Sequence, residues 1–436
     1  MGYATKGMAV SLSGLLLLAA CSTDGTGPGG GDPPVAGDYV VFAWNDLGMH
    51  CLNPTYDKLV ILPPYNNLVA QVVKRGNPPE ILTAGIRVDY RLLNNTQSYG
   101  KASFGQFWDN AVPLFGEMFG FNSLPQNVGL LGNGLSGTMV LAGDYFIASG
   151  LPVVPIDDGG SWNPYQVGVL TVKDGSNAVL VETHATVPTS DEMHCDHCHG
   201  ADAFTDILAK HDEESGTDLL GSTPVLCADC HGDPALGQSG EGSSGVYLSE
   251  AMHGFHADKD ATCYDCHPGT ATACSRSIAH TAADGNCVTC HGNMAEIAGS
   301  IEAGRVPWAD EPACSDCHTE TQGVATGDAL YRNATGHGGL GCPACHGSPH
   351  AMIPTTQATD NYQALQYQNF NGVVKTMGSC GICHGNSRGE GAGSDFSGVH
   401  GGANPERHNA CHVCHTVVPA TGNLWPHAYT WTNSNR

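Results

Sequence analysis

Residues 263–267 read Cys263-Tyr264-Asp265-Cys266-His267, and this pattern, Cys-x-x-Cys-His, decides how the chain is organised. It occurs eight times between Cys195 and His415 and takes up sixteen of the 19 cysteines. The cysteines of the eight copies are Cys195 and Cys198, Cys227 and Cys230, Cys263 and Cys266, Cys287 and Cys290, Cys314 and Cys317, Cys342 and Cys345, Cys380 and Cys383, and Cys411 and Cys414. The histidines that close the copies are His199, His231, His267, His291, His318, His346, His384 and His415.

The spacing within each copy suits the covalent attachment of haem. Two thiols three residues apart on one helical turn can bond to the two vinyl groups of one porphyrin, and the adjacent histidine can supply the proximal nitrogen to iron. We therefore expect eight haem c groups, attached through the motif cysteines and ligated by the motif histidines. A Cys-x-x-Cys pair can also be half a zinc site or a redox-active dithiol. The histidine after every pair, and the export signal described below, favour haem.

The remaining fourteen of the 22 histidines are enough to give every iron a second axial ligand. Those set aside are His194, His197 and His412, which lie in or beside motifs, His50 in the N-terminal region, and His184 and His408, whose role stays open. The eight predicted second ligands are His211, His253, His256, His280, His337, His350, His400 and His427. The alternative for each is an ordinary surface histidine.

Local spacing supports part of this set. His253 and His256 stand three residues apart and would project on one side of a helical turn, where they could serve two adjacent haems. His346 and His350 stand four apart, so that one helical face could hold the proximal ligand of one haem and the distal ligand of its neighbour.

The N-terminus carries an export signal. Residues 1–20 have Lys6 in a charged region, followed by an apolar run that ends in Leu18-Ala19-Ala20-Cys21, which looks like a bacterial lipoprotein lipobox. That resemblance implies a lipid-modified Cys21, and Ser22 after it resembles sorting to the outer membrane. An ordinary signal peptide with an incidental cysteine is the alternative. Residues 21–37, rich in Gly and Pro, then form a flexible tether.

Residues 38–186 contain no copy of the motif and predict a different fold. Short β-branched or aromatic runs, such as residues 38–44, 68–73 and 167–172, alternate with turns rich in Pro, Asn and Gly. This pattern predicts an all-β, sandwich-like module. For residues 187–436 we expect an octahaem cytochrome c domain with little regular secondary structure, in which short helices and loops pack around haems.

Three residues outside the motifs have open roles. His50 and Cys51 could ligate a metal or reach a haem, or they could be structural, with His50 hydrogen-bonded and Cys51 buried or disulfide-bonded. Apart from Cys21, the only cysteine left over is Cys274. A Cys51–Cys274 disulfide would join the two regions in an oxidising compartment, and two separate free thiols are the alternative.

The formal net charge of −25 argues against nucleic acid as a partner, since phosphate binding needs clustered Lys and Arg and the chain has only 17. The charge would steer cationic partners or metal ions towards the protein, or it could simply keep an acidic surface soluble.

The lipobox and the eight motifs together resemble the multihaem c-type cytochromes on the outer surface of metal-respiring bacteria. The stretches that carry the resemblance are residues 252–267 and 342–350. It implies bis-histidine haems in a continuous chain that passes electrons from the cell envelope to extracellular acceptors such as metal oxides. It also implies other envelope cytochromes as partners, a membrane anchor, and a chain that could polymerise into filaments.

Two other functions stay open. Octahaem oxidoreductases that convert nitrite, hydroxylamine or tetrathionate resemble this chain in haem number, but they need one iron with an open site. All eight motifs here end in His and candidate ligands are in surplus, which favours an electron carrier, with terminal metal reduction as an added activity. We assign no catalytic residue. An adhesive role of the β-rich module is the third alternative.

Overall fold

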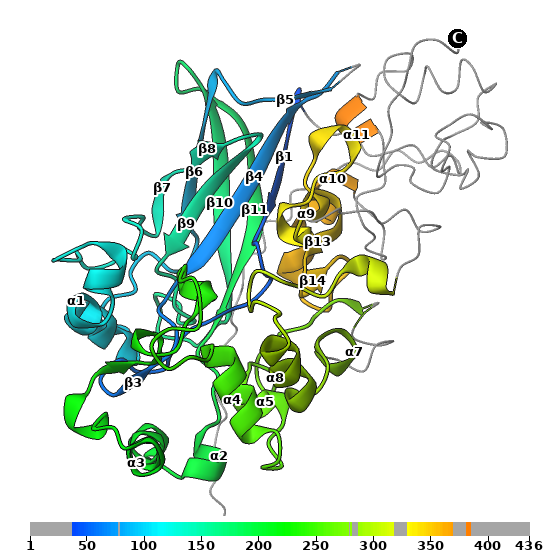
Figure 1. Cartoon of the computed structure of the whole chain (residues 1–436). Helices are drawn as coiled ribbons and strands as arrows, with labels where there is room; N and C mark the ends of the chain where they lie inside the picture. The colour runs from blue at the N-terminus through cyan, green and yellow to red at the C-terminus, as the bar shows by residue number, and fades with distance from the viewer. Residues whose placement is uncertain are drawn as a thin grey trace, which may run out of the picture. The chain divides into compact units, whose positions relative to one another are not determined.

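The computed structural model describes residues 37–76, 79–278, 280, 287–317, 329–368 and 381–384. Between residues 39 and 190 these form two five-stranded β-sheets (Figure 1). Every strand pair of the first sheet is antiparallel, in the order β1-β4-β9-β8, with β5 added to β4. Its strands are β1 (Tyr39–Trp44), β4 (Asn66–Lys74), β5 (Glu80–Ile81), β8 (Val140–Ala142) and β9 (Tyr145–Leu151).

The second sheet has the order β2-β11-β10-β6-β7. Its strands are β2 (His50–Cys51), β6 (Ile86–Leu92), β7 (Ser136–Thr138), β10 (Tyr165–Asp174) and β11 (Val179–Ser190). All its pairs are antiparallel except β2 with β11, which is parallel and sets Cys51 opposite Ser190.

The two sheets bury one face against each other. Side chains two residues apart along each strand, the period of a pleated strand, supply a shared apolar core. From the first sheet these include Val41, Leu68, Ala70 and Val72, and from the second Val88, Tyr90, Leu170, Val172 and Val187. The sandwich-like arrangement of strands expected from the sequence therefore exists.

The first sheet also buries its opposite face. Val40, Phe42 and Trp44 of β1 pack against side chains near the other end of the described chain, among them Ala344 and Tyr367. The Tyr367 hydroxyl accepts a hydrogen bond from the Val41 N–H and donates one to the Val41 carbonyl, both at 3.0 Å. Figure 1 shows β1 beside α9 and α10.

The expectation of an all-β module is wrong for one segment. Helix α1 (Gly105–Phe119) buries Phe107, Trp108, Ala111, Leu114 and Phe115 in a second apolar cluster. Their spacing along the chain, one, three or four residues, is that of one helical face. Pro113 and Gly116 inside the helix, both poor helix formers, hide that signal in the sequence.

From residue 191 onward the described chain consists of short helices, turns and two-residue strands, as expected. The helices that matter below are α2 (Asp196–His199), α3 (Ala203–Ser215), α4 (Leu248–His256), α5 (Cys263–Cys266), α7 (Cys287–His291), α8 (Met294–Glu302), α9 (Cys342–His346), α10 (Tyr362–Gln368) and α11 (Gly381–His384), with 3-10 turns η3 (Cys227–Asp229), η5 (Cys314–Asp316), η8 (His337–Gly339) and η9 (Ala358–Asn361). Two small ladders also occur, β3 (Leu59–Val60) with β12 (Val225–Leu226) and β13 (Gly347–Ser348) with β14 (Ala351–Met352).

The boundary expected at residue 186 falls inside β11, which continues to Ser190. The β3–β12 ladder crosses the same boundary. The β-rich and motif-bearing regions therefore share strand pairing as well as apolar packing. None of the helices in the described ranges has the length and apolar character of a membrane-spanning segment.

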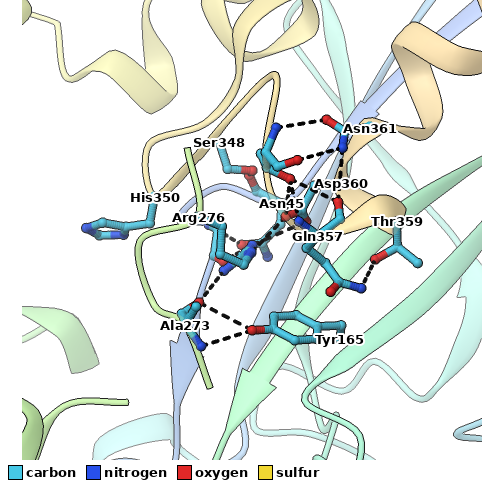
Figure 2. Close-up of polar contacts among 12 residues, drawn as sticks. Asn45, Tyr165, Ala273, Arg276, Ser348, His350, Gln357, Thr359, Asp360 and Asn361 are labelled. Atoms are coloured by element: carbon cyan, nitrogen blue, oxygen red, sulfur yellow. Dashed lines mark hydrogen bonds and ion pairs between the residues drawn. The ribbon is translucent and has the colours of Figure 1, made fainter. Parts of the chain in front are cut away.

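A buried arginine also joins the two regions (Figure 2). The Arg276 side chain is 1% exposed, and its Nε lies 2.7 Å from Asp360 Oδ2. Its Nη2 donates to the Gly48 carbonyl at 2.7 Å, and its Nη1 donates to the carbonyls of Ala273 and Cys274. The guanidinium also lies 5.2 Å from the centre of the Tyr165 ring. The Asp360 carboxylate thus balances the charge of Arg276, and the three carbonyls accept its remaining hydrogen bonds.

Candidate functional site

Every described copy of the Cys-x-x-Cys-His motif lies on a short helical turn. Each motif is named below by its first cysteine. The turns are α2 for the Cys195 motif, η3 for Cys227, α5 for Cys263, α7 for Cys287, η5 for Cys314, α9 for Cys342 and α11 for the Cys380 motif. In the first three copies the motif histidine N–H donates to the carbonyl of the first cysteine, at 2.8–3.0 Å. This bond closes a helical turn, so the two thiols lie on the same side.

The side chains of the described motif cysteines are partly buried or exposed. Burial raises the pKa of Cys266 and of Cys345 to about 11 and that of Cys227 to about 12. Among the described residues, the only group of three or more metal-ligand side chains is His194, Asp196 and His197, and no group contains two cysteines. A zinc site built on a motif would need such a group. The motif thiols could instead form thioether bonds to a porphyrin.

Three motif histidines each lie near a histidine that the sequence predicts as a second ligand. The ring centres of His253 and His267 are 6.1 Å apart, those of His291 and His350 also 6.1 Å, and those of His211 and His231 6.3 Å. An imidazole nitrogen lies about 2.0 Å from the metal it ligates and about 1.2 Å from its ring centre, so two imidazoles on opposite sides of one iron have centres about 6.3 Å apart. The three centre-to-centre distances match this spacing, with angles between the ring planes of 21°, 30° and 84° for the three pairs in that order.

The hydrogen bonds of these histidines leave the correct nitrogen for a metal. Nδ1 of His253 lies 2.7 Å from the Ser249 carbonyl and Nδ1 of His350 lies 3.1 Å from that of Leu47. His211 and His231 direct Nδ1 to the hydroxyls of Thr217 and Ser244, both at 3.0 Å. Fixing Nδ1 in this way orients Nε2 towards a metal.

Two of the paired histidines are held neutral by their surroundings. Burial lowers the pKa of both His267 and His350 to about 4, and neighbouring imidazoles add to the effect. The neutral imidazole is the form that binds a metal.

Neighbouring motifs touch one another. His197 Nδ1 of the Cys195 motif lies 2.8 Å from the Asp265 carboxylate of the Cys263 motif, and the His194 N–H donates to the Asp265 carbonyl at 3.0 Å. Burial, and then the adjacent Cys263 thiol, raise the pKa of Cys287. The Cys195, Cys263 and Cys287 motifs are therefore consecutive neighbours in space.

The series continues through two more motifs. Burial is the main cause of the raised pKa of Cys314, and the nearby Cys290 thiol contributes. Burial, and then Cys314, raise the pKa of Cys342 in the same way. Five motifs thus follow one another in space, in the order Cys195, Cys263, Cys287, Cys314 and Cys342.

The other predicted ligands have these positions. Nδ1 of His199 is held by Asp206 at 2.7 Å, that of His256 by the Met252 carbonyl at 2.8 Å, and that of His280 by the Ser277 hydroxyl at 3.4 Å, while His337 begins η8 and His346 ends α9. The predicted residues outside the described ones are Cys21, His318, Cys380, the His384 side chain, His400, Cys411, Cys414, His415 and His427.

The residues with open roles near the β-rich module have structural surroundings. The His50 side chain is 7% exposed and its Nε2 lies 2.7 Å from Asp46 Oδ1, which satisfies a core histidine. Cys51 and Cys274 are both free thiols, and burial raises the pKa of each. The ring of His184, on β11, packs against that of Tyr362 at 5.4 Å.

One residue that shapes this site, Glu192, could not be recognised from the sequence. Its carboxylate accepts hydrogen bonds from the backbone N–H groups of Thr270, Ala271 and Thr272 at 2.7–2.8 Å, and it lies 3.2 Å from His194 Nε2. It therefore fixes the loop after the Cys263 motif to the end of β11. Buried Asp and Glu that anchor loops have no sequence pattern of their own.

Replacing Glu192 by glutamine should lower the free energy of unfolding by about 2 kcal/mol at pH 7, because the backbone donors lose a charged acceptor. Despite partial burial, which opposes it, the backbone hydrogen bonds lower the pKa of Glu192 from 4.5 to about 2. A depressed pKa stabilises the fold above the unfolded value, and this contribution is lost as the pH falls through the folded value. The difference between wild type and Glu192→Gln in urea unfolding should therefore narrow between pH 4.5 and pH 2. A difference that stays constant over this range would contradict the assignment.

Comparisons of the chain with protein-family models, with curated proteins and with solved structures each found no match.

Proposed function

We propose that the protein is a multihaem electron-transfer cytochrome that holds one haem c at each of its eight motifs. The observation that carries the proposal is the spacing of the three histidine pairs, His253 with His267, His291 with His350, and His211 with His231. Each pair combines a motif histidine with one from outside the motifs, which is the donor set of a bis-histidine haem.

The paired side chains determine what such a centre can do. Haem, when bound, supplies a one-electron redox centre. Each histidine pair would hold such a group with two imidazoles, and if both ligated the metal, transfer of electrons is the chemistry that these ligands would permit. The Ser249, Leu47, Thr217 and Ser244 oxygens hold the imidazoles in place and tune their basicity.

The order of the motifs supports passage of electrons over a distance. A hydrogen bond joins the Cys195 and Cys263 motifs, and electrostatic effects between thiols link the described Cys263, Cys287, Cys314 and Cys342 motifs in that order. Centres attached to them would form one continuous path. The Cys227 motif, with His211, adds a further centre.

We place this path at the outer surface of a bacterial cell, held there through Cys21, with other envelope cytochromes as donors and extracellular acceptors such as metal oxides. The lipobox-like sequence and the net charge of −25, which attracts cations, support this location and these acceptors. Association of copies into filaments is compatible with the same chemistry.

Low-temperature electron paramagnetic resonance of the oxidised, purified protein, with haem stoichiometry measured alongside, tests the proposal. Eight haems, all low-spin, are the expected result, because every iron would have two strong nitrogen ligands. One high-spin haem in eight would support an octahaem oxidoreductase for nitrite, hydroxylamine or tetrathionate instead. A protein without covalent haem would overturn both.

Substitution of Cys21 by alanine should release the protein from membranes, because the residue that would carry the lipid is removed. The measurement is the share of the protein in the membrane fraction of cells that express each form, with Ser22→Ala as the matched control that keeps the cysteine. Retention of Cys21→Ala in membranes at the level of the control would show that Cys21 is not the anchor.

A further inference from the structure

We propose that His194, Asp196 and His197 form a binding site for a divalent first-row transition-metal ion. One ligand atom from each of the three lies within 4.8 Å of the other two, and they form the only such group among the described residues. The ring centres of His194 and His197 are 4.8 Å apart, and the two ring planes are nearly parallel, with an angle of 5° between them. The site goes beyond the proposed electron transfer and does not depend on it.

The strongest support comes from the groups behind the two imidazoles. The Glu192 carboxylate lies 3.2 Å from His194 Nε2, and the Asp265 carboxylate lies 2.8 Å from His197 Nδ1. Each imidazole therefore keeps its other nitrogen for a metal. A carboxylate on the far nitrogen is the usual partner of a metal-ligating histidine, since it fixes the tautomer and strengthens the ligand.

Both of these carboxylates are themselves anchored. Glu192 is held by three backbone N–H groups of residues 270–272. Asp265 accepts hydrogen bonds from the Thr262 N–H and hydroxyl, both at 2.7 Å. Carboxylates held in this way orient the imidazoles they touch.

The site can be reached from solvent, and its ligand atoms favour certain metal ions over others. The His197 side chain is 55% exposed and that of His194 27%, and Asp196 is also exposed. Two imidazoles and one carboxylate suit zinc, copper or nickel, whereas calcium and magnesium prefer oxygen ligands alone. Ligand atoms around one zinc lie about 3.3 Å apart, so the side chains must move closer to bind an ion, which rotamer changes of exposed side chains allow.

The remaining coordination positions are open to water, and the motif thiols take no part. Asp196 and His197 are the two residues between Cys195 and Cys198, so the cysteines stay available for attachment of haem. An ion at this place would lie beside the first motif of the spatial series.

Isothermal titration calorimetry of the full-length, haem-loaded protein with zinc ion alone measures the zinc affinity and tests the site. Wild type should bind one equivalent of zinc at this site. His197→Gln and Asp196→Asn should each lower the zinc affinity at least tenfold. Asp265→Asn changes no ligand and should weaken binding 10- to 100-fold through His197. His184→Gln is the matched control, because the His184 ring packs against Tyr362 and lies outside the cluster, and this variant should bind as wild type does. Haem content and far-UV circular dichroism verify that each variant is folded.

Equal zinc affinity in wild type, Asp196→Asn and Asp265→Asn would overturn the proposal. A new high-spin haem signal in His194→Gln or His197→Gln would also overturn it, because that imidazole would then be an iron ligand. If His197→Gln fails to fold or to retain haem, Asp265→Asn still decides the question, since it lies on a different motif.

Discussion

Replacing Arg276 by methionine should lower the free energy of unfolding by about 3–5 kcal/mol, the largest effect on stability that we expect from one substitution of a charged residue. The Arg276 and Asp360 side chains are 1% and 5% exposed. Methionine fills similar space but leaves the Asp360 charge buried without its partner. It also removes the hydrogen bonds to the Gly48, Ala273 and Cys274 carbonyls, of which the bond to Gly48 links the two regions.

Arg87→Met is the matched control. Arg87 pairs with Asp89, but its side chain is 45% exposed, and exposed ion pairs contribute only about 0–1 kcal/mol. The measurement is urea unfolding followed by far-UV circular dichroism. Equal shifts of the unfolding midpoint in the two variants would mean that the buried Arg276–Asp360 pair stabilises the fold no more than an exposed pair does.

If the proposed haems are present, replacing His253 by alanine should convert one of them from low-spin to high-spin. Its ring centre lies 6.1 Å from that of His267, so the substitution would remove one of the two imidazoles proposed to ligate the haem of the Cys263 motif. Electron paramagnetic resonance of the oxidised protein measures the change, and the potential of that haem should rise as a strong donor is lost.

Two controls make the assignment specific. His184→Ala removes a histidine whose ring packs against Tyr362 and should leave all spin states unchanged. In a Cys263→Ser/Cys266→Ser background, which lacks the attachment site, His253→Ala should have no further effect. A high-spin signal that persists there would show that His253 serves a different motif.

Much of the β-rich region could be predicted from the sequence. Runs of β-branched and aromatic residues at 38–44, 68–73, 86–90 and 167–172 mark β1, β4, β6 and β10, because alternate side chains of each strand reach the core. Helix α1 was missed because Pro113 and Gly116 weaken its local preference, while burial of Phe107 and Phe115 stabilises it.

The candidate site was only partly predictable. The position of each turn follows from its motif, since the spacing of two cysteines and a histidine is a local property. The pairing of His291 with His350 joins residues far apart in sequence, and only the packing of the intervening chain brings them together. The role of Glu192 depends likewise on a loop some eighty residues away.

Both faces of the first sheet are buried, which affects how the protein folds during synthesis. A nascent chain emerges N-terminus first. The strands that cover the β1 face towards the second sheet are made soon after β1. Val40, Phe42 and Trp44 on the other face must wait for Ala344 and Tyr367, roughly 300 residues later. Until then an apolar stripe faces water, and it would favour aggregation with other incomplete chains. Maturation thus calls for a holding factor, or for synthesis that outpaces association between incomplete chains.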